Sequence, residues 1–246
     1  MEIYFLLALA GFFAFAFSTI AGGGGALILV PFVDFVLGSR AVAPVVQLGN
    51  FIGRPTRIFL FWKHIDWRIT RTYLPLAIVG AWIGTWLFVN VNATVIQLAI
   101  ALFLISTLWQ FRWGKSAKSF PMKLGYFAPL GFVVAIISTL IGATGPVLNP
   151  FYLNYGVEKE VLIATKAVNS FLLAIAQLSF YTFFGALYGN MWYYGLSIGV
   201  GASLGNYLGK FLLQKISDKS FRLILVIFMA LSGVIILLKI AMEYFS

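Results

Sequence analysis

The chain contains no cysteine and a single histidine, His64, among its 246 residues. Without cysteine there are no disulfide frameworks, thiol nucleophiles, zinc–thiolate sites or cysteine-held iron–sulfur clusters. A lone histidine argues against a histidine-built metal site and against a Ser-His-Asp triad. We therefore expect no metal site, no cofactor and no catalytic residues.

Charged residues are scarce as well, at 10% of the sequence, whereas 61% of the residues are hydrophobic. Water-soluble domains average about 25% charged and about 45 to 50% apolar residues, so a single soluble domain is excluded. Each membrane span needs about 20 apolar residues. The chain has room for about eight to ten segments and for no extramembrane domain, which predicts an all-α polytopic membrane protein.

Acidic residues are the rarer of the charged types, with 7 Asp and Glu against 17 Lys and Arg. In a soluble protein this excess would suggest nucleic acid, but here the basic residues lie between apolar runs, where they orient membrane proteins. We expect a lipid bilayer as the surroundings and no nucleic acid. The first apolar run follows Glu2 and no Lys or Arg, which favours a retained helix over a signal peptide.

Two of the apolar runs are too short to cross a hydrocarbon core of about 30 Å at 1.5 Å per residue. The ten runs cover residues 3–21, 26–37, 41–62, 72–90, 94–111, 124–141, 146–155, 161–184, 191–211 and 221–241. The short ones are 26–37 and 146–155, and each follows a longer run and a break rich in small residues. The breaks are Gly22-Gly23-Gly24-Gly25 and Gly142-Ala143-Thr144-Gly145-Pro146. This pattern predicts Gly-interrupted, broken or re-entrant helices.

The two halves of the sequence resemble each other. Ser18 to Gly22 match Ser138 to Gly142, Pro31-Phe32 match Pro150-Phe151, Asn50 matches Asn169, Gly80 and Gly84 match Gly201 and Gly205, and Thr94 to Ser106 match Ser220 to Ser232. Self-similarity of this kind indicates two copies of a unit of about 120 residues. We assign residues 1–111 to the first repeat, 112–123 to a basic cytoplasmic linker and 124–246 to the second repeat.

The basic residues give the two repeats opposite orientations. Lys and Arg gather in the links at 63–71, 112–123, 156–160 and 210–222, whereas those at 38–40, 91–93 and 185–190 hold only Arg40. The positive-inside rule then places the first group in the cytoplasm. Equivalent links differ in charge, which predicts two inverted repeats of about five segments each. It also predicts a multi-pass protein of the cell inner membrane with both termini extracytoplasmic.

The breaks are the first candidate for a substrate site. Half-helix N-termini carry free backbone N–H groups that attract negative charge, and inverted-repeat transporters place them near the membrane midplane. The candidate residues are Ser18, Thr19, Gly22, Gly23, Gly24, Gly25, Ser138, Thr139, Gly142, Thr144 and Gly145. The alternative is tight helix packing by small residues. Packing explains the pairs Gly80/Gly84 and Gly201/Gly205 better than it explains four consecutive glycines, because each of those glycines weakens a helix by about 1 kcal/mol.

Polar stripes after each broken pair are the second candidate. Gln47, Asn50, Arg54 and Arg57 share one helical face, and Lys166, Asn169, Ser170 and Gln177 form a similar group. Polar residues inside spans usually face the bundle interior or a water-filled path. The alternative is snorkelling to the interface, which Arg57 and Lys166 are near enough to reach. We place Gln47, Asn50, Arg54, Arg57, Lys166 and Asn169 in the predicted substrate site.

Asp34 is the only acidic residue well inside an apolar run. A structural ion pair with an arginine and a role as carrier of a coupled proton both account for a carboxylate there, and the ion pair is the more common. Basic residues outnumber this single acid in the predicted spans. The permeating species is therefore expected to be a small anion.

A family resemblance rests on five features: Ser18-Thr19-Ile20-Ala21-Gly22-Gly23-Gly24-Gly25, Pro31, Asn50, the pair Asp66-Trp67 and the weaker copy starting at Ser138. With these features the sequence resembles the TauE/SafE, or sulfite exporter, family of membrane permeases. The resemblance covers essentially the whole chain. It implies a bacterial or archaeal inner-membrane transporter of sulfur-containing anions such as sulfite or organosulfonates. The second break departs from the glycine-rich pattern at Ala143-Thr144, which weakens the transfer of substrate contacts to that half.

The sequence therefore predicts a secondary transporter for a small anion, working by alternating access around a midplane site. A passive anion channel with the same basic lining is the nearest alternative. An intramembrane enzyme would need a serine with a buried base or a His-Glu-x-x-His motif, and the sequence contains neither arrangement. A purely structural membrane protein would not need polar stripes in both halves.

Overall fold

The computed structural model describes residues 2–20, 25–55, 58–59, 62–113, 120–143, 148–212, 230–231, 233–238 and 240–242. In the first half the helices are α1 (Glu2–Ile20), α2 (Gly25–Leu37), α3 (Ser39–Gly53), the 3₁₀ helix η1 (Trp62–His64), α5 (Trp67–Asn90) and α6 (Ala93–Trp113). In the second half they are η2 (Leu124–Tyr126), α7 (Phe127–Ile141), α8 (Asn149–Tyr155), α9 (Lys159–Phe183) and α10 (Met191–Leu212). No strand occurs within these ranges, so the all-α prediction is confirmed for the part of the chain they cover.

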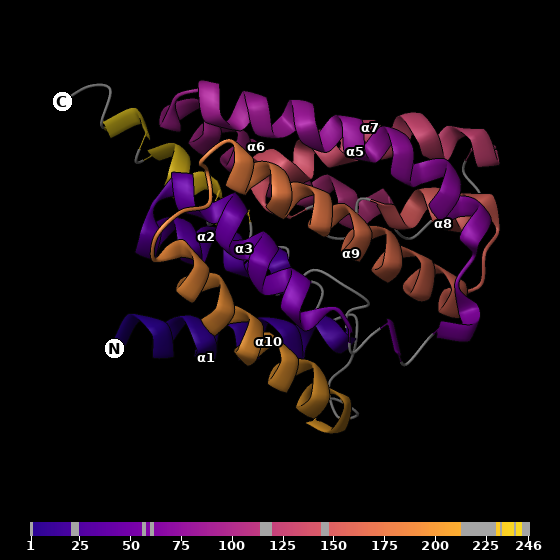
Figure 1. The fold of residues 1–246 in the computed structure, drawn as a ribbon, viewed down its shortest axis with the longest axis horizontal. Helices are drawn as coiled ribbons and strands as arrows, with labels where there is room; N and C mark the ends of the chain where they lie inside the picture. The colour runs from indigo at the N-terminus through magenta and orange to yellow at the C-terminus, as the bar shows by residue number, and fades with distance from the viewer. Residues whose placement is uncertain are drawn as a thin grey trace.

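The helices are arranged around a central pair. α5 and α7 run side by side along one edge of the molecule, α1 and α10 pack together along the opposite edge, and α3 and α9 lie between them (Figure 1). α10 also packs on α3, and α5 also packs on α9. Each half of the chain thus packs one of its outer helices against the other half.

Glycines set the close approach at both edges. A Cβ at Gly201 would overlap the carbonyl of Ala8, and one at Gly80 would overlap the carbonyl of Phe132. Contacts through small residues are the usual way for membrane helices to approach backbone to backbone. The packing role expected for these glycines is therefore what the structure shows.

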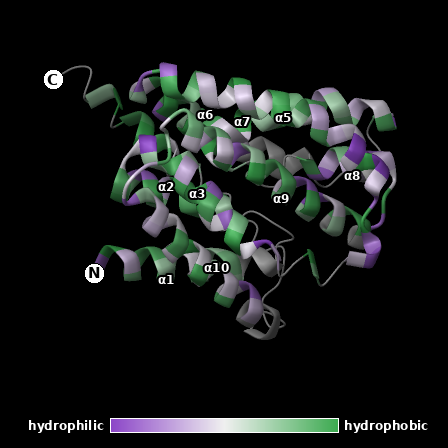
Figure 2. Cartoon of the chain, viewed as in Figure 1, coloured by the Kyte–Doolittle hydropathy of each residue, from purple (hydrophilic) through white to green (hydrophobic). Residues whose placement is uncertain are grey.

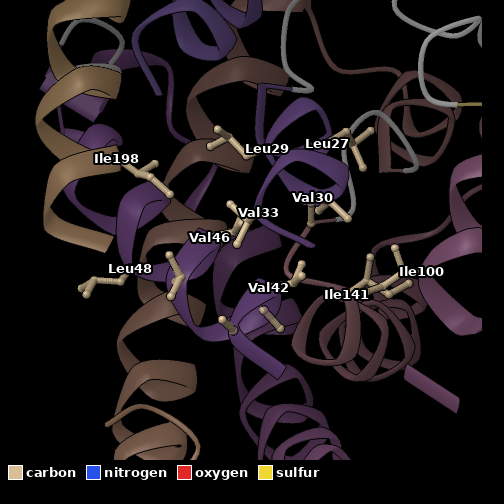
Figure 3. Close-up of a cluster of buried hydrophobic side chains, with 14 of the residues drawn as sticks. Leu27, Leu29, Val30, Val33, Val42, Val46, Leu48, Ile100, Ile141 and Ile198 are labelled. Carbon is tan, nitrogen blue, oxygen red and sulfur yellow. The ribbon is translucent and has the colours of Figure 1, made fainter. Parts of the chain in front are cut away.

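The core is almost entirely aliphatic where α2 and α3 meet their neighbours. Figure 3 shows Val33 of α2 beside Val46 of α3, and Ile100 of α6 beside Ile141 of α7. All four side chains are buried. The short helix α2, with its 13 residues, is therefore held by packing on α1 and α3 rather than by its own length.

Large apolar side chains also cover the outside of the helices. Phe35 is 90% exposed, Phe59 80% and Phe183 79%. Along the drawn helices hydrophobic residues predominate (Figure 2). Two helical stretches, Trp67–Asn90 and Leu124–Ile141, are long and apolar enough to cross a bilayer by themselves. In water this surface would be a severe aggregation hazard, whereas hydrocarbon chains solvate it.

One apolar run is divided in the structure. We expected a single helix over 41–62, but α3 ends at Gly53, just before Arg54 and Pro55. Pro55 has no N–H to bond the carbonyl four residues earlier, and its ring disfavours helix at the preceding residue. The Gly53 carbonyl, at the same helix end, accepts a hydrogen bond from Asn206 Nδ2 of α10 at 2.9 Å. A long-range side chain thus satisfies one of the carbonyls at the end of α3.

Candidate functional site

The site centres on the crossing of α3 and α9. Gln47 of α3 bonds Gln177 of α9, and Arg54, farther along α3, bonds Ser170, which lies earlier on α9. The two helices therefore run antiparallel. Between these contacts the rings of Phe51 and Phe171 stack with centroids 4.9 Å apart. The crossing brings Gln47 and Arg54 of the first predicted stripe against Gln177 and Ser170 of the second.

A network of buried amides and hydroxyls links α3, α9 and α7. Gln47 Nε2 donates to Gln177 Oε1 at 2.9 Å. Gln177 Nε2 in turn donates to Ser138 Oγ at 2.7 Å and to Thr139 Oγ1 at 2.8 Å. Tyr181, one turn beyond Gln177, donates its hydroxyl to the Thr139 carbonyl. All of these side chains are buried. The polar end of α7 is therefore tied to the middle of both crossing helices.

The end of α7 reaches this network through a left-handed glycine. Gly142 has φ 86° and ψ −10°, and its N–H bonds the Ser138 carbonyl at 2.8 Å. A Cβ there would lie 3.0 Å from Ala43 Cα, so the chain presses against α3 one turn before Gln47. Glycine is required both by the positive φ and by this close approach.

Several buried polar atoms of the site have no protein partner. Among the described residues, Gln47 Oε1, Asn50 Nδ2 and Asn169 Oδ1 lack a hydrogen bond although their side chains are at most 3% exposed. Leaving such a group unpaired costs about 1 to 3 kcal/mol. Unpaired acceptors and donors of this kind are groups that a polar ligand or water can satisfy.

Two cationic side chains flank the crossing. Arg54 NH1 donates to the Ser170 carbonyl of α9 at 2.8 Å, and Lys166 Nζ donates to Asn149 Oδ1 of α8 at 2.7 Å. Both side chains are half-buried. The amide of Asn169 donates to the Tyr152 hydroxyl at 2.9 Å, so α8 is tied to α9 by two polar contacts. The described residues of the predicted stripes therefore face protein rather than the outer surface.

The remaining predicted residues are placed as follows. Gly25 is buried at the start of α2, and Ser18 and Thr19 lie in the last turn of α1. Six further candidates, Gly22, Gly23, Gly24, Arg57, Thr144 and Gly145, lie outside the residues that the structure describes. The structure brings Gln47, Ser138 and Thr139 into one network, while Lys166 and Asn169 form a second group at α8.

The more common interpretation of Asp34, an ion pair with an arginine, is wrong for the part of the chain that the structure describes. Its carboxylate Oδ1 accepts the Ser39 hydroxyl at 2.6 Å, and no cation of the described residues contacts it. The nearest arginine in the sequence, Arg40, instead donates to the carbonyls of Phe88 and Val91 at 2.7 and 2.6 Å. Arg40 thereby satisfies carbonyls at the C-terminal end of α5.

Sequence reasoning left some contributors out of the site. Gln177 was noted on the second stripe but not placed in the substrate site, and Tyr152, Tyr181 and Asn149 were missed. In the repeat Gln177 corresponds to Ile58 and Tyr152 to Val33, so the comparison of halves gives no polar signal there. Only the helix crossing reveals their role.

An open groove of about 580 Å³ lies elsewhere, between α1 and α10. It is lined by Tyr4, Ala8, Asn190, Tyr193, Leu196, Ser197 and Val200. No predicted site residue lines it, and most of its lining is apolar. The candidate site is therefore the polar crossing and not this groove.

A bundle of apolar helices around buried amides and half-buried cations is typical of a polytopic membrane transport protein. The sequence model described as Sulfite exporter TauE/SafE matches residues 7–236, nearly the whole chain. The chain therefore belongs to the TauE/SafE sulfite exporter family, whose members are membrane transporters rather than enzymes. No curated protein and no solved structure matches it.

Proposed function

We propose that the chain is an inner-membrane permease for a small anion, a sulfur-containing oxyanion or organosulfonate, and that the anion binds at the crossing of α3 and α9. The observation that carries this proposal is the buried polar layer with unpaired atoms on Gln47, Asn50 and Asn169. Arg54 and Lys166 flank the layer. A guanidinium grips an oxyanion with two parallel N–H donors, which an ammonium cannot do.

The packing supports a relation between the two halves by inversion. Residues of α1 match α7 and those of α5 match α10, so the α1–α10 and α5–α7 contacts are equivalent pairs. α3 and α9 are likewise equivalent and cross each other. A pseudo-two-fold axis in the membrane plane, as in other inverted-repeat transporters, would exchange these pairs.

The two equivalent contacts differ by one helical turn. A Cβ at Gly201 would overlap the carbonyl of Ala8, whereas one at its counterpart Gly80 would overlap the carbonyl of Phe132, which corresponds to Phe12. A Cβ at Gly11 would overlap the carbonyl of Ile198, whereas one at its counterpart Gly131 would overlap the carbonyl of Tyr73, which corresponds to Tyr194. Both comparisons give the same shift of four residues, about 6 Å along a helix.

This difference supports alternating access. If the two halves exchanged conformations, α10 would move by one turn along α1 while α5 moved by one turn along α7 in the opposite sense. One-turn ratchets between packed helices are a known form of switching. The site at the α3–α9 crossing would then open to one side of the membrane at a time.

Cross-linking tests the one-turn movement, and a chain without native cysteine suits it. The rings of Tyr4 and Tyr194 are 5.3 Å apart, and a four-residue shift would bring Tyr4 to Asn190 instead. We expect disulfides in both double variants, Tyr4→Cys with Tyr194→Cys and Tyr4→Cys with Asn190→Cys. Each should block sulfite uptake into proteoliposomes, and reduction should restore it. Uptake that continues at the parent rate in both oxidised variants would favour a passive channel.

Labelling of single cysteines tests the topology. Asn92→Cys and Asn190→Cys are expected to react with an impermeant maleimide from the periplasmic side. Ser116→Cys and Ser217→Cys should react only from the cytoplasmic side, because their links carry the basic residues. The links at 92 and 217 are equivalent in the repeat, so labelling both from one side would contradict the inversion.

A further inference from the structure

We propose that Asp34 is the proton-binding residue that couples the transporter to a pH gradient. This proposal rests on the permease function proposed above. It starts from the position of the residue: α2 is otherwise free of charged side chains, and Asp34 is 7% exposed in its last turn. By the charge of the links, this end of α2 faces the outside.

The carboxylate has one neutral partner. Ser39 donates its hydroxyl to Oδ1 at 2.6 Å, and Ser39 is itself buried. Oδ2 makes no hydrogen bond with another of the described residues. A buried carboxylate without a cation is costly in the charged form, because its desolvation is not offset by an opposite charge. A bound proton removes that cost by converting the charged group to a neutral acid.

None of the charged or titratable groups on the described residues around Asp34 serves it as a counter-ion. The helices packed on α2 are α1 and α3. Among the described residues α1 contributes Glu2 and Tyr4, and α3 contributes Arg40 and Arg54. Arg40 is engaged with the carbonyls at the end of α5, and Arg54 donates to Ser170 at the other end of α3.

The step itself is a proton transfer with no redox change. A proton from water at the outer end of α2 forms an O–H bond at the free carboxylate oxygen, and the side chain passes from charge −1 to neutral. When the site opens to the other side, the O–H bond breaks and the proton returns to water there. α2 packs on α3, and α3 carries Gln47 and Asn50 of the candidate site. Protonation of Asp34 and binding of the anion are therefore linked through α3.

The test separates coupling from transport in proteoliposomes holding the full-length protein. The first assay measures exchange of labelled sulfite at equal pH, and the second measures net sulfite movement driven by a pH gradient. We expect Asp34→Asn to keep exchange within about twofold and to lose gradient-driven movement by about tenfold or more, since an amide cannot bind the proton. Asp34→Glu should restore coupling. The matched control is Glu158→Gln, which removes an exposed carboxylate that makes no capping bond.

Three results would overturn the proposal. Gradient-driven movement that persists in Asp34→Asn would show that another group carries the proton. Loss of exchange together with coupling in folded Asp34→Asn protein would assign the residue to the substrate site. Parent protein that exchanges sulfite but ignores the pH gradient would exclude proton coupling. Failure of the permease function is distinct, since the parent would then show no exchange.

Discussion

Replacing Arg54 with glutamine is expected to raise the dissociation constant for sulfite by roughly tenfold to a hundredfold. The physical reason is the loss of a charge-assisted hydrogen bond in a site shielded from water, worth about 1.5 to 3 kcal/mol. Lys166→Gln should show a smaller loss, because an ammonium offers a point charge rather than two parallel donors. Calorimetric titration of the purified variants measures both effects.

The control for this comparison is Arg112→Gln, at the end of α6 and the start of the predicted basic link, where the charge is expected to lie in water. Its dissociation constant should stay within about twofold of the parent value, because solvent screens exposed charges. If Arg54→Gln and Lys166→Gln also bind like the parent, the basic residues only anchor the helices. The assignment of an anion would then lose its electrostatic support.

The buried amide network offers the second large effect. Gln177→Leu removes the acceptor of the Gln47 amide and the donor to Ser138 and Thr139. We expect a fall of about 1 to 3 kcal/mol in the free energy of unfolding, because Gln47 Nε2 is left buried without its close partner. Sulfite affinity should fall by at least tenfold. The measurements are thermal or denaturant unfolding in detergent and calorimetric titration.

The double variant Gln47→Leu with Gln177→Leu separates structure from binding. Replacing both partners by apolar groups of similar size leaves no orphaned amide, so most of the lost stability should return. Sulfite binding should remain weak, since the polar layer is gone. A double variant that recovers both stability and affinity would show that the network holds the helices together and does not contact the anion.

Much of the helix pattern could be predicted from the sequence, because apolar runs and small-residue breaks are local signals. α2 begins at Gly25 and ends at Leu37, close to the predicted run, and α7 ends at Ile141, directly before the predicted break at Gly142. The division at Gly53 was missed, although Pro55 was visible, because hydropathy stays high across it. A proline alone does not determine whether a helix bends or ends. Asn206, whose side chain donates to the Gly53 carbonyl, is far away in the sequence.

The site was predicted in part for a similar reason. Asn50 and Asn169 repeat in the two halves, so comparing the halves finds them. Gln177 and Tyr181 reach Thr139 from another helix, and no spacing within the sequence encodes that contact. The partner of Asp34 depends likewise on the turn between α2 and α3, where Gly38 with φ 81° brings Ser39 back to the carboxylate.

The central claim is that this chain binds a small sulfur-containing anion at the α3–α9 crossing. Calorimetric titration of the purified parent protein with sodium and potassium salts of sulfite, a small sulfonate and chloride tests it most directly. We predict saturable binding of one sulfite per chain, competition by the sulfonate, and no dependence on which cation is present. Absence of binding by both sulfur anions, or binding that follows the cation instead, would contradict the account.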